Sequence, residues 1–204
     1  MWKLNEIYAQ NICAFRELQY VIKQGVTTLI FGDNRDNESQ RSNGSGKSAL
    51  IECISIGITG SPLRKIKNEE IINDSSEESL IELTFTNDSI REKFVIERRL
   101  YRKGSSQIKC FIFRGDEFAA QETVQSSIDE YNKFILDKLG ISRDEIYNNF
   151  ILSKYKYQNF LASSDKEKKE FINRFSNGNM VDEAIARIVE DKAPVEKQYN
   201  KLEL

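Results

Sequence analysis

The segment Gly44–Ser48, with the sequence GSGKS, has the composition of a loop that binds phosphate groups. Its glycines let main-chain N–H groups come close to an anion, its lysine reaches the outer phosphates, and its serine hydroxyl is a ligand for Mg²⁺. We therefore predict a Walker A loop for ATP, in which Lys47 acts in catalysis and Ser48 binds Mg²⁺. The residues predicted to contact the nucleotide in this loop are Asn43, Gly44, Ser45, Gly46, Lys47, Ser48 and Ala49. The alternative is a loop of the same shape that has lost its ligand.

The first glycine of this motif is displaced by an insertion. In the pattern G-x-x-x-x-G-K-[ST] it would fall at position 41, which is Arg41. If residues 35–43 bulge outward, Gly32 and Asn34 come next to Gly44 and the pattern is restored. The inserted residues are polar and include no large apolar side chain, which is typical of a solvent-exposed loop. We therefore expect Gly32 and Asn34 to take part in the nucleotide site.

Two elements must position this loop. Val26–Phe31, VTTLIF, is apolar and β-branched without alternation, which favours a strand buried on both faces. After the loop, apolar residues recur at helical spacing, at Leu50, Ile51, Ile54 and Ile58. Gly60 is expected to end that helix. The predicted order of strand, glycine-rich loop and helix is the context that a phosphate-binding loop requires.

Composition excludes several functional classes. The chain has 204 residues, of which 39% are hydrophobic, and a formal net charge of -2, which gives no general attraction to nucleic acid. There is no histidine, so histidine-based triads and metal sites are excluded. The three cysteines are far apart and form no CxxC pair, which predicts free thiols in a cytoplasmic protein. No apolar run is long enough to span a membrane, and no membrane partner is expected.

The remaining pattern predicts a meander of strands followed by helices. The segments that are expected to be strands are Lys3–Asn11, Leu18–Lys23, Ile81–Thr86, Lys93–Tyr101 and Gln107–Phe113. Residues 103–106, KGSS, join the last two as a hairpin. A helix is predicted over Thr123–Leu139, closed by Gly140, and Ser142 with Glu145 has capping-box spacing for a further helix over 142–152.

The C-terminal region carries a seven-residue repeat. Its two series are Val181, Ile188, Val195 and Leu202, and Ile185, Lys192 and Tyr199. This spacing is typical of a coiled-coil seam, and the alternative is a single amphipathic surface helix. Pro194 is expected to kink the helix. Because no cap follows, we expect the chain to be a truncated one. The predicted organisation is an ATPase lobe over residues 1–162 and a helical stalk over 163–204.

Two other classes of nucleotide-binding protein do not fit. The DxxG motif of a small GTPase occurs only at Asp137–Gly140, at the end of a predicted helix, and Asn200–Glu203 only approaches NKxD. A small-molecule kinase would keep a compact phosphate loop and would not end in a heptad helix.

Four segments, in this order, resemble the SbcC and Rad-fifty-type DNA-repair ATPases and, more widely, the SMC group. They are LNEIYAQNICAF at 4–15, LIFGDN to SPLR at 29–64, ELTFTNDSIREKFVIERRLYRKGSS at 82–106 and ILSKYKYQNFLASSDKEKKEFINRF at 151–175. The resemblance covers nearly the whole chain. It implies an α/β P-loop fold, the N-terminal lobe of an ABC-type ATPase head, with an antiparallel β meander and the start of a coiled coil.

The resemblance also implies partners. The C-terminal half of such a head carries the signature motif, the Walker B carboxylates and a switch histidine, none of which occurs here. The expected partners are therefore that C-terminal half, a second copy in a homodimer through an ATP sandwich, DNA and an SbcD-like nuclease. Alone, the chain is expected to bind ATP weakly and to hydrolyse almost none. The setting is repair of DNA or defence against foreign DNA; the alternative is a non-catalytic scaffold that binds nucleotide.

Further site residues follow from the resemblance. The family has a glutamine in its Q-loop, and Lys154 aligns at that position in this chain. Lys154 is therefore a candidate catalytic residue, and Gln158 is a candidate to replace the glutamine in catalysis and in binding Mg²⁺. The alternative is that Lys154 is a surface charge. Arg16 and Arg64 are candidate nucleotide contacts or solvated charges, since Cys13 and Ala14 stand where the family often has arginine and serine.

Two more features have open interpretations. The insertion at 35–43 is expected to gate the joint between heads, to recruit a partner or to fold away. A basic group is either solvated or a candidate contact for DNA, and consists of Arg98, Arg99, Arg102 and Lys103.

Overall fold

The computed structural model describes residues 1–33, 46–115, 121–152, 164–175 and 178–202. The chain divides into two compact units, Met1–Tyr157 and Gln158–Leu204. The inserted segment 35–43 lies outside the described residues, so its predicted outward path stays a prediction.

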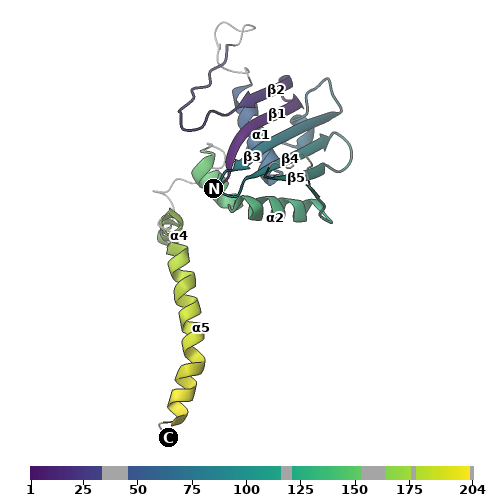
Figure 1. Ribbon diagram of the computed structural model, residues 1–204. Coiled ribbons are helices and arrows are strands. Elements are labelled where there is room, and N and C mark those ends of the chain that lie inside the picture. The colour runs from purple at the N-terminus through teal and green to yellow at the C-terminus, as the bar shows by residue number, and fades with distance from the viewer. Residues whose placement is uncertain (34–45, 116–120, 153–163, 176–177, 203–204) are drawn as a thin grey trace. The chain divides into compact units, whose positions relative to one another are not determined.

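The first unit is built on a six-stranded antiparallel sheet in the order β2-β1-β3-β4-β5-β6 (Figure 1). Its strands are β1 (Lys3–Ile12), β2 (Phe15–Val21), β3 (Glu78–Asn87), β4 (Glu92–Tyr101), β5 (Gln107–Arg114) and β6 (Gln121–Thr123). One row of paired residues crosses its centre, through Ile7, Leu83, Ile96 and Cys110. The predicted meander is therefore confirmed, with the β4–β5 hairpin at residues 102–106.

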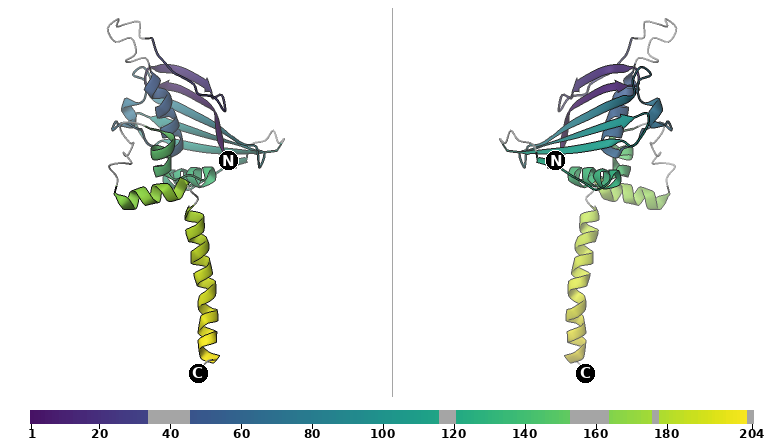
Figure 2. Two further views of the ribbon diagram at one scale, coloured as in Figure 1. Left: turned by 90° about the vertical axis from the view of Figure 1, so that its left-hand side faces the viewer. Right: turned by 90° about the vertical axis from the view of Figure 1, so that its right-hand side faces the viewer.

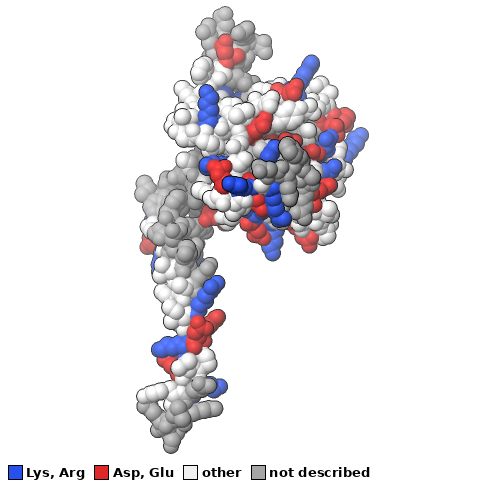
Figure 3. Space-filling view, in the orientation of Figure 1, with Lys and Arg blue, Asp and Glu red and all other residues white. Residues whose placement is uncertain are grey.

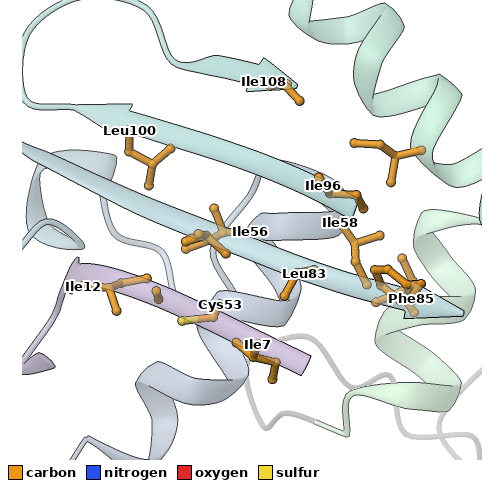
Figure 4. Close-up of a cluster of buried hydrophobic side chains, with 14 of the residues drawn as sticks. Ile7, Ile12, Cys53, Ile56, Ile58, Leu83, Phe85, Ile96, Leu100 and Ile108 are labelled. Carbon is orange, nitrogen blue, oxygen red and sulfur yellow. The ribbon is translucent and has the colours of Figure 1, made fainter. Parts of the chain in front are cut away.

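Alternation along the strands decides which face of the sheet is buried. Ile81, Leu83 and Phe85 of β3 point into the core, whereas Glu82 between them is only half-buried on the other face. Helices α1 (Lys47–Thr59) and α2 (Ile128–Leu139) lie on the core face (Figure 2). Figure 4 shows Cys53 and Ile56 of α1 beside β1 and β3.

Helix α1 lies very close to β3. A Cβ atom on Gly57 would be 2.4 Å from Cδ1 of Leu83, so only a glycine fits there without movement. The helix ends where the sequence predicts, because Gly60 adopts a left-handed conformation and its N–H donates to the carbonyl of Ile56. Helix α1, which follows the predicted phosphate loop, therefore packs closely against the sheet.

In the basic group at the end of β4 and after it, Arg98 is structural, and its candidacy as a contact for DNA is wrong. Arg98 is 1% exposed, because its register places it on the core face, and its guanidinium donates to Gly57 O and Asn132 Oδ1. Burial lowers the pKa of Arg98 to about 10. Arg99 pairs with Glu97 across 3.1 Å. Arg102 donates to main-chain carbonyls of the 68–76 loop, which begins with the 3₁₀ turn η2 (Asn68–Glu70).

The helical segment after β6 differs in part from the prediction. Helix α2 begins at Ile128 and not at Thr123, because residues 121–123 pair with β5 and Ser127 caps the helix. Gly140 closes it, as predicted. The capping box of Ser142 and Glu145 is present and starts α3 (Arg143–Glu145), which continues as a π-helix, η3 (Ile146–Phe150).

The predicted buried strand at Val26–Phe31 is wrong. The structure has no strand there, and Val26, Leu29 and Phe31 are 59%, 83% and 82% exposed. A strand buried on both faces needs neighbouring strands and two covering layers. Within the described part of the chain, no strand pairs with this segment.

The second unit contains α4 (Asp165–Phe175) and α5 (Gly178–Leu202). Pro194 lies inside α5, and the apolar members of the heptad series that the structure describes are exposed, among them Ile188 at 63%. Lys168 pairs with Asp165 in α4. In the described residues, every helix is too short or too polar to cross a bilayer.

Candidate nucleotide site

The predicted phosphate loop runs into the N-terminus of α1. Gly46 is the N-cap residue, with φ of 83° and ψ of -2°, and its carbonyl accepts a 2.9 Å hydrogen bond from the Ala49 N–H. No side chain caps this end, and the first turn contains no acidic residue. The dipole of α1 therefore favours an anion at this end.

Ser48 opens onto a hollow of about 320 Å³ beside α1. The hollow is lined by Ser48, Ile51, Glu52, Ile54, Leu63, Arg64, Phe150, Ile151 and Leu152. It brings together two of the predicted contacts, Ser48 in the first turn of α1 and Arg64 after the end of that helix. Lys47 is half-buried, Ser48 is exposed and Ala49 is buried, so the polar side chains of the motif are those left accessible.

The residues present fit a magnesium–nucleotide complex. Mg²⁺ prefers oxygen ligands and is often held by one or two protein groups together with phosphates and water. The accessible Ser48 hydroxyl at an amide-rich helix end meets that need. Among the described residues, no cluster of three or more carboxylate or cysteine side chains is placed to hold a metal ion.

Arg64 is held at the rim of the hollow by Glu52. The Glu52 carboxylate is 1% exposed and accepts from Arg64 Nε at 2.9 Å and from the Leu63 N–H at 2.7 Å. This pairing raises the pKa of Arg64, so the guanidinium stays charged. Glu52 was not predicted, although a glutamate among the apolar positions of a buried helix face is a signal for a buried ion pair.

The β1–β2 turn approaches the same region. Cys13 Sγ lies 3.8 Å from Arg64 Nη2, and burial raises the pKa of the Cys13 thiol while Arg64 opposes that shift. The next strand begins with Phe15, whose ring lies against Gly46. Nothing in the sequence pattern singled out Phe15.

The π-helix η3 is fastened to α1 by hydroxyl groups. The Tyr147 hydroxyl lies 2.8 Å from Thr59 Oγ1 and 3.1 Å from Ser55 Oγ, and all three residues are buried. The chain leaves η3 along Ile151 and Leu152, which line the hollow together with Ser48. The residues that precede the predicted Q-loop position therefore line the same hollow as Ser48.

The other predicted site residues either lie away from the hollow or fall outside the described residues. Arg16 on β2 is exposed and does not line the hollow, and Gly32 is half-buried after the exposed 26–31 segment. The remaining ones lie outside the described residues and stay predictions, namely Asn34, Asn43, Gly44, Ser45, Lys154 and Gln158.

The family of the chain follows from its sequence as a whole. The model of the AAA domain family matches residues 6–203. The chain belongs to the AAA domain family. The α/β P-loop fold that the sequence predicts is thereby confirmed.

Curated relatives of this AAA domain bear the names that the sequence resemblance implied. It is 27% identical over 177 residues to the SbcC component of the nuclease SbcCD of Bacillus subtilis, covering 82% of this chain and 15% of that protein. It is 26% identical over 174 residues to exonuclease subunit 2 of Escherichia phage RB69, covering 84% of this chain and 28% of that protein.

A third relative carries the other name. The AAA domain is 26% identical over 121 residues to the DNA double-strand break repair Rad50 ATPase of Methanosarcina mazei, covering 56% of this chain and 10% of that protein. The similarity to SbcC and Rad50-type ATPases is confirmed, and the chain spans only a small part of the length of these relatives.

Proposed function

We propose that this chain is the ATP-binding lobe of an SbcC and Rad-fifty-type ATPase head that acts on DNA. The observation that carries the proposal is the GSGKS segment at the uncapped N-terminus of α1, with Ser48 and Arg64 around one hollow. The names of the relatives, which include a nuclease component and a double-strand break repair ATPase, support the setting in DNA repair or DNA-end processing. Defence against foreign DNA is a second setting of the same activity.

In this proposal ATP binds with Mg²⁺, which supplies charge neutralisation at the β- and γ-phosphates. The amides of Gly46, Lys47 and Ser48 bind the phosphates, Lys47 reaches the outer ones, and Ser48 Oγ is the protein ligand of the metal. Arg64, fixed by Glu52, adds a positive charge at the rim. Lys154 and Gln158 remain the proposed Q-loop residues, and a lysine there would slow hydrolysis by competing with the metal for its place.

The lobe requires completion. The apolar segment 26–31 is exposed in this lobe, and an exposed apolar run favours partners that cover it. We assign those partners to the C-terminal half of the head, which would also bring the carboxylates that this lobe lacks. In this proposal ATP joins two completed heads in a homodimer, and the insertion 35–43 gates that joint.

The proposed stalk is the region 163–204, in which the exposed apolar series of α5 would pair with a second helix in a coiled coil. DNA contacts are proposed for the completed assembly. On the face shown in Figure 3, Lys and Arg are interspersed with Asp and Glu, and the chain has a net charge of -2. The expected compartment is the cytoplasm, and an SbcD-like nuclease is the proposed protein partner.

One alternative is favoured by a specific residue. Lys154 aligns where the family has glutamine, which fits a non-catalytic scaffold that uses nucleotide as a structural ligand. The two functions differ in turnover. The ATPase predicts hydrolysis by the lobe combined with its C-terminal half, and the scaffold predicts nucleotide-dependent association without hydrolysis.

The first experiment is calorimetric titration of the 204-residue chain with ATP and Mg²⁺, using Lys47→Ala and Ser48→Ala as variants. We expect weak binding by the wild type, loss of binding for Lys47→Ala, and loss of the Mg²⁺ dependence for Ser48→Ala. An exposed lysine of the second unit, Lys192, provides a matched control as Lys192→Ala. No heat with the wild type, or equal heats for Lys47→Ala and Lys192→Ala, would contradict the proposal.

A further inference from the structure

Phe15 lies against the last glycine of the phosphate loop. A Cβ atom on Gly46 would lie 2.6 Å from Phe15 Cζ and 2.8 Å from Phe15 Cε2, so the ring fills the space that another side chain would take. Gly46 also has a φ of 83°, which disfavours any other residue. Phe15 is half-buried and packs against the core. The glycine is therefore bounded on one side by an aromatic ring.

The place of Phe15 is set by an unusual turn. Asn11 and Cys13, which precede it, have φ of 53° and 49°, a left-handed conformation that few residues other than glycine adopt. The turn is held from outside: the Cys13 N–H donates to Ile71 O at 2.6 Å, and the Asn73 side chain donates to Cys13 O at 2.7 Å. Such conformations persist where the surroundings hold them, and they gather at functional sites.

The same turn reaches a second part of the site. Cys13 Sγ contacts Arg64 Nη2, and Arg64 is in turn held by Glu52 at the rim of the hollow that Ser48 lines. The β1–β2 turn and the first residue of β2 thus contact both Gly46, just before α1, and Arg64, after α1. If the Phe15 ring only filled the hydrophobic core, these two contacts at the nucleotide site would not be needed.

We propose that Phe15 is a positioning residue of the nucleotide site, whose ring supports Gly46 and fixes the direction of the first amides of α1. The inference rests on the proposed function for its ligand. The support of Gly46 by the Phe15 ring can be tested without a ligand. The Gly46 carbonyl accepts a hydrogen bond of 2.9 Å from the Ala49 N–H, so this bond depends on the position of Gly46. Movement of Gly46 in the free protein is therefore reported by hydrogen exchange at the Ala49 amide.

The experiment compares Phe15→Ala and Phe15→Leu with a matched control, Phe113→Ala. Phe113 is also half-buried but lies on β5 beneath Lys93, whose Nζ is 5.1 Å from its ring centre. Two quantities are measured in the 204-residue chain: exchange of the Ala49 amide by NMR, and the affinity for ATP with Mg²⁺. Denaturant unfolding of each variant corrects both for global stability.

We expect Phe15→Ala to speed exchange at Ala49 and to weaken ATP binding about tenfold, because a loosened site loses its alignment with the phosphates. Phe15→Leu retains bulk and should weaken binding about threefold, with Phe113→Ala within about twofold of the wild type. In a double variant, Phe15→Ala should partly relieve the loss caused by Gly46→Ala.

Unchanged exchange at Ala49 and unchanged affinity in folded Phe15→Ala would overturn the inference, as would tighter binding, which would mean that the ring obstructs the site. Additive effects of Phe15→Ala and Gly46→Ala would also count against it. If the wild type binds no ATP but Phe15→Ala still speeds exchange at Ala49, the proposed function fails and the support of Gly46 by Phe15 stands.

Discussion

At the scale of single residues, Glu52 joins α1 to the chain that follows it. Its buried carboxylate accepts from the main-chain N–H of Leu63 and from both the N–H and the Nε of Arg64. A carboxylate in such a place is retained only with partners, since an uncompensated buried charge is costly. Glu52 therefore has two roles: it stabilises the wall of the hollow, and it fixes the side chain of Arg64.

We predict that Glu52→Ala lowers the free energy of unfolding by about 2 to 4 kcal/mol, because it leaves the Leu63 N–H and the Arg64 guanidinium without their acceptor. Arg64→Ala should cost less, about 1 to 2 kcal/mol, because the main-chain N–H groups of Leu63 and of residue 64 still donate to the buried carboxylate. Urea unfolding of both variants measures the difference. Equal losses would show that Glu52 does not depend on its main-chain donors.

A second prediction concerns Glu82, which stands directly opposite Glu97 on the outer face of the sheet. Burial and then Glu97 raise the pKa of Glu82, Lys93 opposes the shift, and Glu6 on β1 adds to it. Because the folded-state pKa is raised, the ionised form destabilises the fold, and this cost is absent below the ordinary glutamate pKa of about 4.3.

Glu82→Gln should therefore stabilise the protein at pH 7 by about 0.5 kcal/mol, as expected for removal of a directly opposed like charge. The gain should fade as the pH is lowered through the raised pKa and be gone below about pH 4. Denaturant unfolding across this range tests the sign. Glu78→Gln on the same strand, opposite Tyr101, is the control and should show no such gain.

At the scale of elements, the contact between α1 and β3 sets the depth of the phosphate-loop helix. Gly57→Ala should lower the free energy of unfolding by about 1 to 3 kcal/mol, because the new methyl would overlap Leu83. Helix propensity alone predicts the opposite, a gain of about 1 kcal/mol. A double variant with Leu83→Ala should recover part of the loss caused by Gly57→Ala, and a stabilising Gly57→Ala would disprove the close contact.

The attachment of η3 to α1 gives a prediction at the same scale. Tyr147→Phe removes the hydroxyl between Ser55 and Thr59 and should cost about 1 kcal/mol, with faster hydrogen exchange over residues 146–152. Tyr8→Phe removes a hydroxyl that bonds Glu17 near the outer face of the sheet and serves as the control. If both variants behave alike, the hydroxyl cluster does not hold η3.

At the scale of the whole molecule, the segment 26–31 exposes the apolar side chains of Val26, Leu29 and Phe31, and the proposed function assigns their cover to the C-terminal half of the head. We predict that Leu29→Lys with Phe31→Lys reduces self-association of the isolated chain, since it breaks an exposed apolar patch. The same variant should fail to assemble with the C-terminal half of the head.

Sedimentation velocity measures both the self-association and the assembly. The control is Ile90→Lys, in the exposed β3–β4 turn. Normal assembly of the variant would contradict a role for this segment.

Local patterns in the sequence sufficed for much of the fold. Strand alternation gave the meander, Gly60 and Gly140 marked two helix ends, and Ser142 with Glu145 predicted a capping box, because each of these depends on residues a few positions apart. GSGKS pointed to phosphate for the same reason. The start of α2 was misjudged because strand pairing with β5 outweighed the helical pattern at residues 121–123.

The sequence alone therefore determined most of the local elements, and it predicts phosphate chemistry at residues 44–48. Tertiary structure decided the remainder: that Arg98 is buried on the core face, that Phe15 lies against Gly46, and that Glu52 holds Arg64. These depend on contacts between residues far apart in the chain, for which a linear pattern carries no signal. The 26–31 segment is a further example, because an apolar run predicts burial but does not say which part of a molecule will cover it.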